Sequence, residues 1–128
     1  MSISFVCLVA GGIYHLFFGF FHAKFWTFGF LNWREELPRM TPINRAVIQM
    51  LNIAVLVFMF LIAYISLRYT QELLTPGLGK TILFGIVIFW AARLAGEFTL
   101  KDGTPSNRKL VAALISGILL YLIPAILI

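Results

Sequence analysis

The sequence predicts an all-α integral membrane protein, a four-helix bundle whose N-terminus and C-terminus both lie on the outer side of the membrane. Hydrophobic residues make up 61% of the 128 residues and charged residues only 12%, whereas soluble domains carry roughly 25% charged residues. Most of the chain falls into four apolar stretches, each near the length of about 20 residues that a helix needs to cross a bilayer. The expected spans of this single transmembrane domain are residues 3–23, 43–67, 78–97 and 109–128.

The first two spans are joined by an amphipathic connector. Trp26 and Trp33 flank it, and tryptophan is enriched where the membrane meets water. The pair Thr41 and Pro42 predicts the start of the second span. Threonine is a good N-cap, and proline is tolerated at the first helical position because the N–H that it lacks would be unpaired there anyway.

The third span contains one in-membrane arginine, Arg93. Its insertion cost of up to about 3 kcal/mol is offset by the many apolar residues around it, which contribute about −0.3 to −0.6 kcal/mol each. A turn is expected directly after this span. Thr104 and Pro105 then repeat the threonine–proline pattern, which predicts a capped start for the fourth span.

The orientation follows from the distribution of lysine and arginine. If the N-terminus is outside, only Arg68 and Lys80 of the ten cations lie on the outer side. Because cytoplasmic segments are enriched in cations, this bias predicts outer termini and, we expect, a bacterial cytoplasmic (inner) membrane. The net charge of +5 is then a topology signal rather than a nucleic-acid-binding surface. The inner side receives Lys24, Arg34, Arg39, Arg45, Arg93, Lys101, Arg108 and Lys109.

Polar residues within the spans gather in the half nearer the expected inner side. In a bilayer such groups turn toward the bundle interior or a wet cavity, so they predict a polar pocket that opens inward. From the inner boundary, the layers are His22, Arg45 and Glu97 within about one turn, Gln49 and Arg93 at roughly 6–8 Å, and His15, Asn52 and Ser116 at roughly 12–14 Å, from the helical rise per residue.

Helical spacing supports this pocket but leaves a structural interpretation open. His15 and His22 are seven residues apart, and Arg93 and Glu97 are four apart, so each pair shares a helix face and the second pair can neutralise its charges. Arg93 and Glu97 also lie close enough to the surface for their side chains to reach it. Amide side chains such as Asn52 can simply hydrogen-bond between helices.

Two families of small four-span proteins are similar to this chain in size but differ from it at their functional residues. Small fluoride channels carry a Thr/Ser/Phe track in the third helix, whereas the third span here reads Ile-Leu-Phe-Gly-Ile-Val over residues 82–87. Small multidrug exporters need a central glutamate in the first span, where this chain has His15. The chain resembles neither family at the positions that carry function.

No catalytic motif is present, so we expect no enzymatic activity. The two histidines are separated by about 10 Å along the helix axis, too far to ligate one metal ion, at 1.5 Å per residue. Only Glu97 supplies an acid within the spans, which does not suit a di-metal site. We therefore expect no cofactor.

The leading interpretation is an accessory or ligand-binding subunit that contacts the lipid bilayer and associates with itself or with a membrane complex. The alternative is an oligomeric transporter or channel for a small solute or ion. A haem- or quinone-associated redox subunit is the third possibility. In the leading interpretation the inner-side polar pocket engages a partner or a small ligand, and the sequence names no ligand.

The predicted orientation is testable with single cysteines in a Cys7→Ala background. A cysteine introduced at Ser2 is expected to react with a membrane-impermeant maleimide on intact cells, while one at Thr104 is expected to react only after permeabilisation. Labelling at position 2 only from the cytoplasm would overturn the orientation.

Overall fold

The computed structural model describes all 128 residues, and the fold is all-α. Four of its six helices are long and apolar enough to cross a membrane. This confirms the predicted class: the chain is a multi-pass membrane protein with four spans. The long helices are α1 (Ile3–Ala23), α3 (Pro42–Arg68), α5 (Leu78–Thr99) and α6 (Arg108–Leu127), and the short ones are α2 (Trp33–Arg39) and α4 (Thr70–Leu73).

The start of α3 follows the prediction. Thr41 is the N-cap, and its hydroxyl accepts a hydrogen bond from the backbone N–H of Asn44 at 3.4 Å. Pro42 takes the first helical position. One of the four N–H groups that a helix start leaves unpaired is thereby satisfied.

The predicted start of α6 at Thr104 and Pro105 is wrong. Both residues lie in the irregular connector, and the N-cap is Asn107. Its side-chain oxygen accepts from the backbone N–H groups of Lys109 at 2.9 Å and Leu110 at 3.4 Å. Asparagine is at least as good an N-cap as threonine, and here it satisfies two unpaired donors at once.

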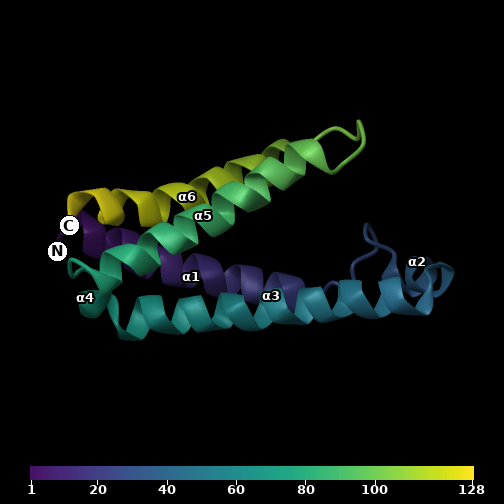
Figure 1. The fold of residues 1–128 in the computed structure, drawn as a ribbon, viewed down its shortest axis with the longest axis horizontal. Coiled ribbons are helices and arrows are strands. Elements are labelled where there is room, and N and C mark those ends of the chain that lie inside the picture. Colours follow the sequence, from purple (N-terminus) through teal and green to yellow (C-terminus); the bar gives the residue numbers. More distant parts are fainter.

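The long helices form two hairpins that meet at one end and diverge at the other (Figure 1). Hairpin α1–α3 and hairpin α5–α6 are each closely packed, and α1 also packs against α6. Both termini and α4 lie at the end where the hairpins meet, here called the closed end. The connectors, residues 24–41 and 100–107, lie at the diverging end, here called the open end.

Glycines allow the close helix approaches that hold the closed part of the bundle. A Cβ atom at Gly12 would lie 2.5 Å from the Cγ atom of Leu67. One at Gly117 would lie 2.7 Å from the hydroxyl of Tyr14 and 3.1 Å from the ring of Trp90. Small residues let membrane helices approach closely enough for van der Waals packing, and these glycines serve packing within one chain.

We expect Gly117→Ala to lower the free energy of unfolding by about 1–3 kcal/mol, the usual cost of overpacking a core. The added methyl group meets two aromatic rings that have little freedom to move. Gly85→Ala is the matched control, because a Cβ atom there meets nothing within 4 Å. Denaturant titration in mixed micelles measures the free energy of unfolding of each purified variant. Equal stability of the two variants would contradict the packing argument.

Candidate functional site

A cavity of about 660 Å³ lies between the two hairpins toward the open end. All four long helices and both connectors contribute to its wall. Twelve of its sixteen lining residues are hydrophobic. Its aromatic wall consists of Phe18, Phe21, Phe25, Phe30, Phe89 and Trp90.

A buried chain of hydrogen bonds lies behind the cavity wall and connects all four long helices. The Trp90 indole of α5 donates to Nε2 of His15 on α1 at 3.2 Å. Nδ1 of His15 lies 2.8 Å from the Gly11 carbonyl and 3.0 Å from the Tyr121 hydroxyl of α6. That hydroxyl lies 2.8 Å from the Ser66 hydroxyl of α3. We call this set the four-helix network.

The contacts of His15 also define its tautomer. An indole N–H only donates, so Nε2 must accept and Nδ1 carries the proton. Nδ1 then donates to the Gly11 carbonyl. Both ring nitrogens are engaged, and the side chain is completely buried. His15 therefore supports the cavity wall through Trp90 and has no free nitrogen for a ligand.

His22 lines the cavity itself and is held by Asn52 of α3. The Asn52 amide donates to the His22 carbonyl at 3.0 Å, and its oxygen lies 2.7 Å from Nδ1 of His22. Because that amide oxygen can only accept, Nδ1 donates and Nε2 is the unprotonated nitrogen. No protein group hydrogen-bonds to Nε2, so a ligand in the cavity has an acceptor available there. The ring also stacks on Phe25, with centroids 4.3 Å apart.

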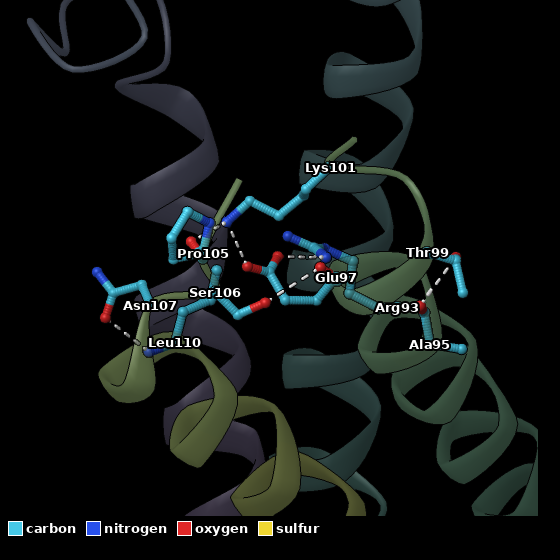
Figure 2. A network of polar contacts seen from close by, with 9 residues as sticks. All are labelled: Arg93, Ala95, Glu97, Thr99, Lys101, Pro105, Ser106, Asn107 and Leu110. Atoms are coloured by element: carbon cyan, nitrogen blue, oxygen red, sulfur yellow. Dashed lines mark hydrogen bonds and ion pairs between the residues drawn. The ribbon is translucent and has the colours of Figure 1, made fainter. Parts of the chain in front are cut away.

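The charged side of the cavity is an ion cluster centred on Glu97 (Figure 2). The Glu97 carboxylate, only 3% exposed, accepts from Lys101 at 2.7 Å and from Arg93 at 3.3 Å. Lys101 also donates to the Pro105 carbonyl at 3.4 Å, and the Ser106 hydroxyl donates to the Glu97 carbonyl at 3.2 Å. The cluster therefore ties the end of α5 to the following connector, and it carries one positive charge in excess.

The structure brings several residues of the predicted polar pocket to the cavity. His22, Arg93 and Glu97 line it directly. Asn52 and His15 do not line the cavity, but they hydrogen-bond to the lining residues His22 and Trp90. These five residues come from α1, α3 and α5, so the divergence of the two hairpins places them around one space.

The other three predicted residues lie away from the cavity wall. Gln49 accepts from the indole of Trp26 at 2.9 Å and donates to the Arg45 carbonyl at 2.9 Å, so it holds the first connector against α3. The Arg45 side chain has no ion-pair partner. Ser116 is exposed on the outer face of α6, where its hydroxyl donates to the Ala112 carbonyl of its own helix at 2.8 Å.

Sequence reasoning missed Lys101 and Trp90. Lys101 follows Glu97 by four residues, the spacing of a helical ion pair, but it falls in the turn expected directly after the third span. Trp90 precedes Arg93 by three residues and therefore shares its helix face. That spacing could have identified it as a cavity residue.

No family model, curated protein or solved structure matches this chain. No three His, Cys, Asp or Glu side chains lie together as a metal site would require. The groups gathered at the cavity are aromatic rings, two cations, one carboxylate and one imidazole. These groups give the cavity an apolar surface, charges and hydrogen-bonding atoms.

The four-helix network is testable with a double-mutant cycle on its last link. We expect Tyr121→Phe and Ser66→Ala each to lower the free energy of unfolding, with a coupling energy of about 0.6 kcal/mol, the average for interhelical hydrogen bonds in a membrane protein. Tyr64→Phe is the control, since Tyr64 is largely exposed on the outer surface. Strictly additive effects would show that the hydroxyl pair does not stabilise the bundle.

Proposed function

We propose that this protein is a non-catalytic membrane protein, an accessory or ligand-binding subunit, that holds an amphipathic molecule in the cavity between its hairpins. One observation carries the proposal: a single space is lined both by aromatic rings and by an ion cluster. Its volume of about 660 Å³ falls in the range of about 300–1,000 Å³ typical of ligand sites.

We further propose that the open end faces the cytoplasm of a bacterial inner membrane. Eight of the ten cations belong to the connectors and helix ends of the open end, and cytoplasmic segments are enriched in lysine and arginine. The cavity would then open to the cytoplasmic face. This orientation rests on the charge bias alone.

The depth of the polar groups fits an amphiphile that lies parallel to the lipids. Arg93 is six residues before the end of α5 at Thr99, so it lies about 9 Å inside the helix end at 1.5 Å per residue. Trp90 lies one turn deeper. A ligand with its polar head at the ion cluster would thus place its apolar part against the aromatic wall.

Transport of a small solute is the second candidate, and the one-sided opening of the bundle is the observation that favours it. The packing of the closed part favours binding instead. Leu8, Leu83 and Tyr121 are completely buried there, so a solute could pass only if the hairpins separated. Because no such separation is needed for a ligand to enter from the open end, we rank binding first.

Ligand binding is testable through Trp90, the one tryptophan buried in the cavity wall. In a Trp26→Phe/Trp33→Phe background, a brominated long-chain alcohol is expected to quench its fluorescence saturably. Ala92→Phe is expected to weaken that binding several-fold, because Ala92 lines the cavity and the added ring occupies it.

The neighbouring Ala91→Phe serves as the matched control. Ala91 is exposed and does not line the cavity, so it should leave the quenching curve unchanged. Equal behaviour of the two phenylalanine variants would mean that the alcohol does not bind in the cavity, and the proposed function would fail.

A further inference from the structure

We propose that the natural occupant of the cavity is a bilayer lipid with an anionic phosphate headgroup, bound by Arg93 and Lys101. This inference rests on the proposed ligand-binding function and specifies the ligand. Three features of the cavity support it: the excess charge of the ion cluster, the free donors of the two cations, and the opening of the cavity between the hairpins.

The excess positive charge favours an anionic ligand. Arg93, Lys101 and Glu97 are the only charged side chains that line the cavity, and they sum to one positive charge. Their surroundings are mostly hydrophobic, and an unbalanced charge is costly within a membrane. A ligand with one negative charge would balance the cluster. A zwitterionic or neutral head would leave the excess in place.

The two cations retain donors for such a head. An arginine side chain has five N–H donors and a lysine three. Arg93 uses one donor on Glu97, while Lys101 uses one on Glu97 and one on the Pro105 carbonyl. Their side chains are 45% and 31% exposed, so the remaining donors are accessible. The planar guanidinium matches a phosphate group with two parallel hydrogen bonds.

Glu97 acts as a positioning residue in this arrangement. Its carboxylate is buried and fixes one donor of each cation. Both cations are thereby held on the same side of the cavity mouth. The cost is that Glu97 cancels part of their positive field, which leads to an unusual expectation: neutralising Glu97 should strengthen binding of an anion.

The shape of the bundle favours a lipid that enters from the bilayer. Helices α3 and α5 share no extensive interface. Near mid-membrane they meet through the rings of Phe58 and Phe89, with centroids 4.8 Å apart. The hairpins diverge toward the open end (Figure 1), and Ala92, which lines the cavity, is exposed. An acyl chain can therefore reach the cavity sideways.

The test measures quenching of Trp90 by brominated lipids in vesicles, in the background that lacks the other two tryptophans. Brominated phosphatidylglycerol carries one negative charge, and brominated phosphatidylcholine with the same chains is net neutral. We expect about a fivefold preference for phosphatidylglycerol, the order expected from one cationic side chain near a membrane surface.

Charge variants test whether the preference for phosphatidylglycerol arises at the cavity. Arg93→Gln and Lys101→Gln should each reduce it toward equal binding, whereas Glu97→Gln should increase it. Arg108→Gln and Lys109→Gln are matched controls, because both cations lie at the open end outside the cavity. If these controls reduce the preference as much as the cavity variants, general surface charge attracts the lipid and the inference is wrong.

The remaining outcomes separate this inference from the proposed function. Equal quenching by both lipids, still weakened by Ala92→Phe, would overturn the anionic headgroup and leave ligand binding intact. Quenching that Ala92→Phe does not change would remove the binding site altogether. If quenching shows that a brominated free fatty acid binds more tightly than phosphatidylglycerol, the proposed phosphate headgroup is wrong.

Discussion

The four-helix network is the interaction on which the arrangement of this bundle depends. Lipid tails are as apolar as the helix surfaces, so burial from water does not select which membrane helices pair. Close packing and interhelical hydrogen bonds make that selection. His15 contacts Trp90 on one neighbour and Tyr121 on another, and Tyr121 contacts Ser66 on the last. His15 thereby connects the two hairpins, together with the Tyr14 hydroxyl of α1, which donates to the Ala113 carbonyl of α6 at 2.7 Å.

The open end lacks a connection of this kind, and that difference creates the cavity. His22 and Asn52 bind each other within hairpin α1–α3. Glu97 and Lys101 bind each other at the turn of hairpin α5–α6. Each hairpin is therefore closed by its own polar contacts. The last hydrogen bond between the hairpins runs from the Tyr14 hydroxyl to the Ala113 carbonyl at 2.7 Å, and no hydrogen bond or ion pair joins them nearer the open end. The divergence accompanies this change in where the polar residues have their partners.

Sequence reasoning predicted the four spans because they depend only on counting apolar residues along the chain. The direction in which a side chain points depends on helix rotation, which packing decides. Ser116 shows the difference: it was expected near mid-membrane in the pocket, yet it faces outward on α6. Arg93 and Glu97 do form the expected pair, but the connector returns Lys101 to the same carboxylate. The i, i+4 spacing of Glu97 and Lys101 is a signal for this second contact, and it gives the cluster its excess charge.

Trp90 takes part in both the four-helix network and the cavity wall. Its indole N–H closes the four-helix network, while its ring forms part of the cavity wall. A ligand that presses against this ring therefore contacts the side chain that links α5 to α1. Since a ligand shifts a conformational equilibrium only by its different affinity for the two states, an occupant that packs well against Trp90 would stabilise the arrangement in which the hairpins meet. Trp90 is thus the residue that the cavity wall and the four-helix network share.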